Sequence, residues 1–151
     1  MQMIEKIVVP VDFAENTDKL VAYACAVAER FEAAIHFIHV VASYPGDVMI
    51  GAPFAEEYRD RIMFAAEERM KSLVEDCKGK GRVCTGIVVG GEPVEKIVDL
   101  AASAAADLVV ISTHGAKGLE KILLGSVAER VLKRAHCPVL IMNPFKAMKK
   151  K

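Results

Sequence analysis

The chain has 151 residues, of which 53% are hydrophobic and 26% are charged, and 20 lysines and arginines balance 20 aspartates and glutamates. A chain of this length buries roughly 68–70% of the surface that its unfolded form exposes, so it holds a core without disulfide or metal staples. The apolar fraction and the zero net charge exclude a disordered polypeptide and argue against a basic nucleic-acid-binding protein. We therefore expect a single domain over 1–151, with its core at about 4–143 and a solvated basic tail at 146–151.

The cysteine spacing and the N-terminal segment bear on the cellular location of the protein. The four cysteines, at positions 25, 77, 84 and 137, form no C-x-x-C pair and have no metal-ligand spacing. Glu5 and Lys6 interrupt what would be the apolar core of a signal peptide. No apolar run approaches the roughly 18 residues that a membrane helix needs. We expect a cytoplasmic protein with no membrane partner, no metal ligands of its own and four free thiols.

Short β-branched runs alternate along the chain with longer segments of helical period, which is typical of βαβ units. Strands are predicted at 7–11, 35–41, 83–89, 108–111 and 138–142. Helices are predicted to begin near 17, 56, 93 and 126. Apolar residues recur at steps of three and four in the first and last helices: Leu20, Val21, Ala24, Val27, Ala28 and Phe31 in the first, and Val127, Val131, Leu132 and Ala135 in the last.

This order predicts an α/β fold, a single doubly wound, Rossmann-like, mainly parallel five-stranded sheet flanked by four helices. The continuous apolar character of the first strand indicates burial on both faces. In such sheets ligands bind at the carboxyl ends of strands, near the point where the strand order reverses. The residues directly after the first and fourth strands are therefore the candidates for a site. The long connection at 42–55 is a lid, a partner patch or ordinary packing, and the sequence does not choose among these.

Two common phosphate-binding loops are absent from the sequence. No glycine follows the first strand, so there is no G-x-G-x-x-G dinucleotide loop, and no Gly-Lys-Ser/Thr occurs, so there is no P-loop. The protein is thus neither a standard dinucleotide-binding enzyme nor a P-loop NTPase.

The segment 112–127 is the strongest candidate for a site, because a strand end, a bend at Gly115 and a helix start at Gly125 and Ser126 fall within sixteen residues. Glycines allow close backbone approach to an anion, and helix N-termini carry partial positive charge. The Ser126 hydroxyl and the N–H groups of Ser126 and Val127 could hold phosphate oxygens. The alternative is that these glycines are ordinary turn residues.

Two further residues have a functional and a structural interpretation. Asp12, after the first strand, either accepts hydrogen bonds from a base or ribose or caps the following turn. His114 either contacts a phosphate or orients the loop by a hydrogen bond. No paired nucleophile and base has readable spacing, so no catalytic residue is assigned.

Several motifs together resemble those of the universal stress protein family. They are Val9-Pro-Val-Asp-Phe13, His39-Val40, Ser112-Thr-His-Gly115 followed by nine residues and Gly125-Ser126, Val127-Ala-Glu-Arg-Val131 and His136-Cys-Pro-Val139. The resemblance covers about residues 4–143.

The resemblance implies an adenine nucleotide alpha hydrolase-like fold and a homodimer through the last strand. The ATP-binding branch of that family carries G-x2-G-x9-G-S/T, which places its second glycine at Gly115, its third at Gly125 and its hydroxyl at Ser126. Ser112 stands at the first glycine and departs from the pattern. The remaining residues that the resemblance brings to the nucleotide are Pro10, Val11, Asp12 and Val40 on the adenine and ribose side, with Ile111 and Val127 nearby.

The leading hypothesis is a cytoplasmic universal stress protein that binds ATP, with Mg²⁺ held mostly by phosphates and water, and acts as a nucleotide-dependent stress-response regulator. It is not expected to be an enzyme beyond slow ATP hydrolysis. The alternative is a family member that binds no nucleotide and works as a dimeric interaction module, which the Ser112 departure supports. A third hypothesis is an enzyme that activates a substrate with ATP; the small size of the chain weighs against it.

Overall fold

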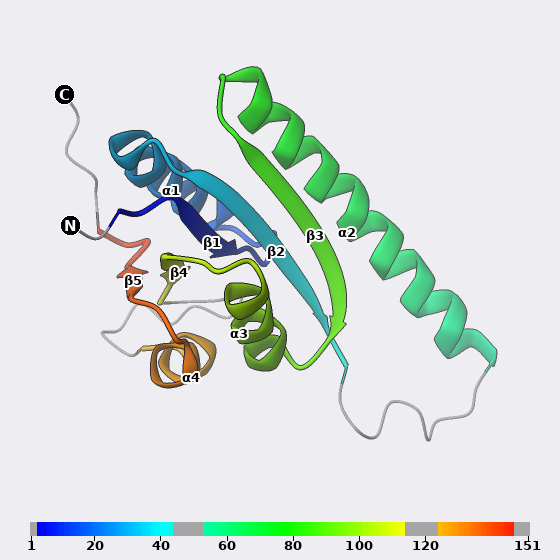
Figure 1. The fold of residues 1–151 in the computed structure, drawn as a ribbon. Helices are drawn as coiled ribbons and strands as arrows, with labels where there is room; N and C mark the ends of the chain where they lie inside the picture. The colour runs from blue at the N-terminus through cyan, green and yellow to red at the C-terminus, as the bar shows by residue number, and fades with distance from the viewer. Residues whose placement is uncertain (1–2, 44–52, 114–123, 147–151) are drawn as a thin grey trace.

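The computed structural model describes residues 3–43, 53–113 and 124–146, which form a parallel sheet with helices on both faces (Figure 1). The predicted βαβαβαβαβ order is confirmed. The strands are β1 (Lys6–Pro10), β2 (Ala34–Ala42), β3 (Cys84–Gly91), β4 (Leu108–Ser112) and β5 (Val139–Met142). The helices are α1 (Thr17–Phe31), α2 (Pro53–Gly79), α3 (Pro93–Ser103) and α4 (Ser126–Arg134).

The strand order is β3-β2-β1-β4-β5, with every neighbouring pair parallel. The chain first moves outward from β1 through β2 to β3, and then returns through α3 to place β4 on the other side of β1. Val8 therefore pairs with His36 of β2 on one side and with Val109 of β4 on the other. The strand order reverses between β1 and β4, which is where a doubly wound sheet opens a crevice at its carboxyl edge.

Two cores lie on opposite faces of the sheet because successive strand residues point to opposite sides. Ile7 and Val9 belong to the core that α1 and α2 cover, whereas Val8 belongs to the core that α3 and α4 cover. All three side chains are fully buried, which confirms the predicted burial of β1 on both faces. Figure 1 shows α3 and α4 together on one side of the sheet, with α1 and α2 on the other.

The longest helix, α2, packs closely on the edge strand β3 because Gly86 has no side chain. A Cβ at this position would overlap the Met70 thioether and would lie 2.8 Å from Val74, both of α2.

None of the described helices, α2 included, is both long enough and apolar enough to cross a membrane.

Two residues that were predicted on the buried faces of the first and last helices are exposed. Phe31 is 52% exposed because it is the last residue of α1, and Glu32 then turns the chain with a φ of 56°. Leu132 is 46% exposed because it follows the fully buried Val131, and consecutive helical residues point about 100° apart. Element bounds otherwise differ from the predictions by up to three residues, the largest shift being the start of α2 at Pro53.

Candidate functional site

The candidate site lies at the carboxyl edge of the sheet, where β1 and β4 are neighbours. The chain leaves β1 at Pro10 and continues through Val11 and Asp12, and it leaves β4 at Ser112 and continues through Thr113. Because the two strands are parallel and paired, their carboxyl ends lie at the same edge. The structure thus places the residues after the first and fourth strands together, as predicted from the strand order.

Asp12 caps the turn that leads into α1. Its Oδ1 accepts hydrogen bonds from the Ala14 N–H at 2.9 Å and from the Thr17 hydroxyl at 3.2 Å. Asn16 occupies the N-cap position of α1 without making a side-chain cap. The local interpretation of Asp12 is therefore confirmed. The carboxylate is exposed and both bonds use one oxygen, so a second acceptor oxygen stays available for other donors.

The turn after β1 is held by residues that the sequence analysis did not assign to the site. His39 Nδ1 lies 2.7 Å from the Val11 carbonyl oxygen and must donate its proton to it. The His39 ring packs against Phe13 with centroids 4.9 Å apart, and Phe13 has a φ of 56°, which non-glycine residues rarely adopt. Arg69 of α2 adds a longer hydrogen bond of 3.4 Å to the Phe13 carbonyl. The sequence signals for Phe13 and His39 were their places in the motifs Val9-Pro-Val-Asp-Phe13 and His39-Val40.

The start of α4 is fixed to the end of β4 by a backbone contact. The Gly125 N–H donates to the Thr113 carbonyl at 2.8 Å, and a Cβ at Gly125 would lie 2.5 Å from that same oxygen. Glycine is therefore required here by the contact with Thr113. The sequence suggested that a glycine is needed here so that a ligand can approach the backbone closely. In the structure, the contact with the Thr113 carbonyl is what requires glycine.

Helix α4 presents its N-terminus at this edge. Gly125 is its N-cap and provides no side chain to cap the first N–H groups, and Ser126 is the first helical residue and is exposed. Helix N-termini of this kind carry about half a positive charge and bind anions. Glu129, in the first turn, donates its own N–H to the Gly125 carbonyl.

The apolar residues predicted for the site are divided between the two faces of the sheet. Val11 is buried in the core on the α1 and α2 face, whereas Val40, Ile111 and Val127 lie on the face that α3 and α4 cover. Ile111 is buried in the core on this second face, and Val40 and Val127 are half-buried and pack against it. Pro10 and Ser112, the last residues of their strands, are half-buried. The two remaining predicted residues, His114 and Gly115, lie outside the described residues.

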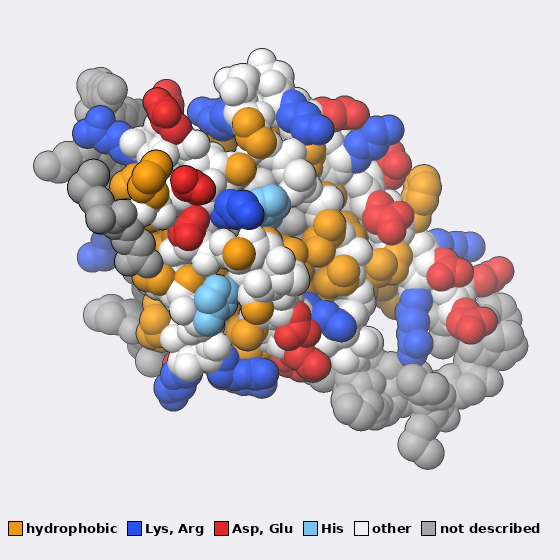
Figure 2. Space-filling view, in the orientation of Figure 1, with side chains coloured by type: hydrophobic (Ala, Val, Ile, Leu, Met, Phe, Trp, Pro, Cys, Tyr) orange, Lys and Arg blue, Asp and Glu red, His pale blue; other side chains and the backbone are white. Residues whose placement is uncertain are grey.

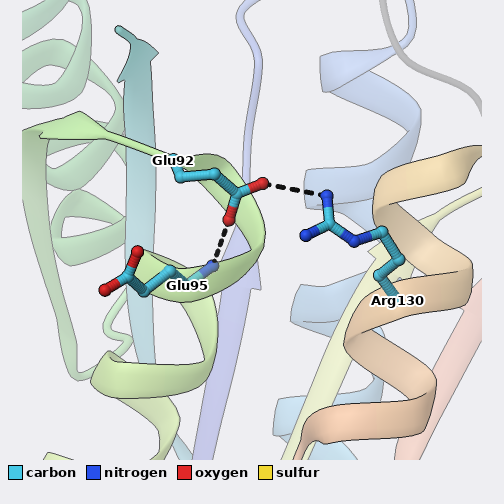
Figure 3. Close-up of polar contacts among 3 residues, drawn as sticks. All are labelled: Glu92, Glu95 and Arg130. Carbon is cyan, nitrogen blue, oxygen red and sulfur yellow. Dashed lines mark hydrogen bonds and ion pairs between the residues drawn. The ribbon is translucent and has the colours of Figure 1, made fainter. Parts of the chain in front are cut away.

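A charged contact joins the middle of α4 to the N-terminal end of α3 (Figure 3). Glu92, the N-cap of α3, accepts a hydrogen bond from the Glu95 N–H at 2.7 Å, and Arg130 of α4 donates to its other oxygen at 3.0 Å. The Glu95 N–H and then the Arg130 guanidinium hold the pKa of Glu92 below its ordinary value of 4.5. This contact was not predicted, because the two residues are 38 positions apart.

The remaining ionisable side chains do not form a metal centre. His36 pairs with the Thr85 hydroxyl at 2.7 Å, whereas His39 pairs with Val11, so these two histidines have separate partners. Within 3–43, 53–113 and 124–146, no three His, Cys, Asp or Glu side chains gather in a way that could bind a metal ion. On the face shown in Figure 2, basic and acidic side chains are interspersed and neither sign forms a continuous patch.

The fold and the site define a doubly wound α/β domain in which a helix start without a side-chain cap lies at the switch point of the sheet. Residues 3–143 match the model of the universal stress protein family. The universal stress protein MJ0531 of Methanocaldococcus jannaschii is 34% identical over 144 residues, which cover 93% of this chain and 83% of that protein. The chain therefore belongs to the universal stress protein family.

Among the solved structures that share this fold, two are compared with this chain. One is that of MJ0577 from the same archaeon, with a TM-score of 0.83 and 28% identity, covering 94% of this chain and 97% of that one. The other is a universal stress protein in complex with cyclic AMP, with a TM-score of 0.65 and 22% identity, covering 95% and 99%.

Replacing Gly125 with alanine tests the backbone contact. The added methyl group meets a carbonyl oxygen that cannot move away without breaking the end of β4, so Gly125→Ala should lower the free energy of unfolding by about 1–3 kcal/mol. Urea unfolding measures this. The control is Gly90→Ala, whose Cβ would have only the Val41 carbonyl nearby, at 3.9 Å. Equal stabilities of the two variants would show that the Thr113 contact does not require glycine.

The depressed pKa of Glu92 predicts a pH dependence of stability. A carboxylate with a lower pKa in the folded state stabilises the protein above its unfolded pKa, and this stabilisation is lost as the pH falls through the folded pKa. Glu92→Gln should therefore cost roughly 1 kcal/mol at pH 7 and clearly less at about pH 3. Urea unfolding at both pH values checks this, with Asp99→Asn, on the exposed side of α3, as the control. A cost that is equal at both pH values would contradict the role of the Glu92 charge.

Proposed function

We propose that this chain binds an adenine nucleotide, ATP with Mg²⁺ held mostly by the phosphates and water, at the carboxyl edge of β1 and β4. It acts in the cytoplasm as a nucleotide-dependent stress-response regulator and has no catalytic residue. The observation that carries this proposal is the start of α4, which lacks a side-chain cap and is held at the end of β4 by the Gly125 to Thr113 bond. A phosphate group provides the negative charge and the acceptor oxygens that such a helix start binds.

Different residues at the carboxyl edge of the sheet are proposed to bind the phosphates, the ribose and the base of the nucleotide. In this proposal the N–H groups and hydroxyl at Ser126 hold phosphate oxygens, assisted by Val127, Ser112, His114 and Gly115. The available oxygen of Asp12 accepts a ribose or base donor. The half-buried Pro10 and Val40, with the small exposed parts of Val11 and Ile111, contact the adenosine. The structural neighbour solved with cyclic AMP supports the adenine nucleotide class.

Thermal unfolding tests nucleotide binding directly. Nucleotide-stripped protein is melted with and without millimolar MgATP, with GTP, AMP and cyclic AMP alongside. A ligand at a hundred times its Kd adds ~2.7 kcal/mol of stability, which should raise the Tm by roughly 5–10 °C. A rise with adenine nucleotides alone supports the proposal. No shift with any nucleotide would favour the non-binding interaction module that the serine at position 112 suggests.

Two variants locate the bound nucleotide within the edge. Asp12→Asn keeps the acceptor oxygen that caps the turn but removes the carboxylate, so it should reduce the ATP-induced shift with little loss of basal stability. Ser126→Ala removes only an exposed hydroxyl and should reduce the shift for ATP more than for adenosine. Full shifts in both variants would move the nucleotide away from this edge.

We also propose a homodimer through β5, which is an edge strand paired only with β4 among the described strands. The carbonyls of Pro138 and Met142 accept hydrogen bonds from Val109 and Thr113, so the intervening odd-numbered residues direct their N–H groups outward. Ile141→Pro removes one such outward N–H and should convert the dimer to a monomer, whereas Ile141→Val should not. Light scattering at tens of micromolar measures the mass, and a monomeric wild-type chain would refute the proposal.

A further inference from the structure

Three cysteines from distant parts of the chain meet in the core on the α1 and α2 face. Cys25 comes from α1, Cys77 from the last turn of α2 and Cys84 from the first residue of β3, and they are 5%, 3% and 2% exposed. All three are free thiols. Because β3 begins at Cys84, this thiol cluster lies toward the amino edge of the sheet, away from the candidate nucleotide site at the carboxyl edge. The chemistry of the thiol cluster is therefore independent of the proposed nucleotide binding.

The three thiols belong to one buried cluster, and Cys77 is its central member. Cys77 lies close enough to both Cys25 and Cys84 for their thiol groups to influence each other. A sulfur close to a second sulfur needs only a small displacement to reach bonding distance, and the effective concentration of the second thiol is high.

A short basic turn separates Cys77 from Cys84. The N–H groups of Lys80 and Arg82 both donate to the Cys77 carbonyl at 3.2 Å, and Gly81 adopts a φ of 78°. This turn is exposed except at Arg82, which is half-buried. An opening of the turn therefore brings water to the two cysteines that flank it and leaves Cys25 on its helix.

Burial and nearby positive charge shift the pKa values of these thiols in opposite directions. Burial raises the pKa of all three, that of Cys25 to about 11, and keeps them protonated and unreactive in the closed structure. The nearby cations, among them Arg82, lower the same pKa values. When the turn opens, the effect of burial is lost and that of the cations remains, so the pKa values of Cys77 and Cys84 fall and a larger fraction of each becomes thiolate.

We infer that Cys77 and Cys84 form a disulfide when the chain meets hydrogen peroxide, while Cys25 stays a thiol. The Cys84 thiolate attacks one peroxide oxygen and breaks the O–O bond, giving a sulfenic acid and water. The Cys77 thiolate then attacks that sulfur, forms the S–S bond and displaces the oxygen as water. In total, two thiols and one peroxide give one disulfide and two water molecules.

The test is peptide mapping of the full chain after peroxide treatment, with remaining thiols alkylated under denaturing conditions. The wild type should fall from four free thiols to two and give a linked peptide pair containing Cys77 and Cys84. Cys25→Ala should lose two thiols as well, whereas Cys77→Ala and Cys84→Ala should not form a disulfide. A Cys25–Cys77 linkage, a sulfinic acid without a disulfide, or no thiol loss in the wild type would each overturn the inference.

The rate of oxidation tests the opening of the turn. Gly81→Ala places a side chain on a residue with positive φ, which weakens the closed turn and should speed disulfide formation by about fivefold or more. Gly79→Ala is the matched control, because a Cβ there has open space and no positive φ is involved. Equal rates for both variants would show that oxidation does not proceed through an open turn.

Discussion

The burial of the central strands on both faces is the constraint on which the rest of this structure depends. Parallel strands cannot be joined by tight hairpins, so each pair needs a crossover, and here the crossovers are helices. A strand such as β1, whose residues Ile7, Val8 and Val9 are fully buried, must be covered from both sides. Helices on both faces in turn require the winding direction to change, and that change occurs between β1 and β4.

The candidate site follows from this reversal together with a few long-range contacts. At the end of β1, His39 and Arg69 hold a turn that contains a residue of unfavourable φ. At the end of β4, the Gly125 to Thr113 bond aims the start of α4 at the same edge. Glu92 and Arg130 join α4 to α3 in addition (Figure 3). A ligand would therefore meet donors and acceptors that are already positioned, which reduces the entropy lost on binding.

The two ends of the sheet have different chemistry. The carboxyl edge carries a helix N-terminus and an exposed carboxylate, whereas the thiol cluster lies toward the amino edge beneath a basic turn. Because the same sheet connects both edges, an additional covalent bond between α2 and β3 would stiffen one side of the domain without entering the candidate site. Nucleotide binding and thiol oxidation can thus be measured separately on one chain.

The order of strands and helices, the burial of β1 and the importance of the segments after β1 and β4 could all be predicted from the sequence, because hydrophobic periodicity and glycine placement are local. The reasons behind single residues could not. Gly125 was predicted as a site residue, yet its need for glycine arises from Thr113, and Asp12 had two possible roles until Ala14 and Thr17 were seen to bond to it. The contacts of His39, Arg130 and the three core cysteines join residues far apart in sequence. Only tertiary packing decides such contacts, since the sequence by itself determines which elements form and not which side chains meet.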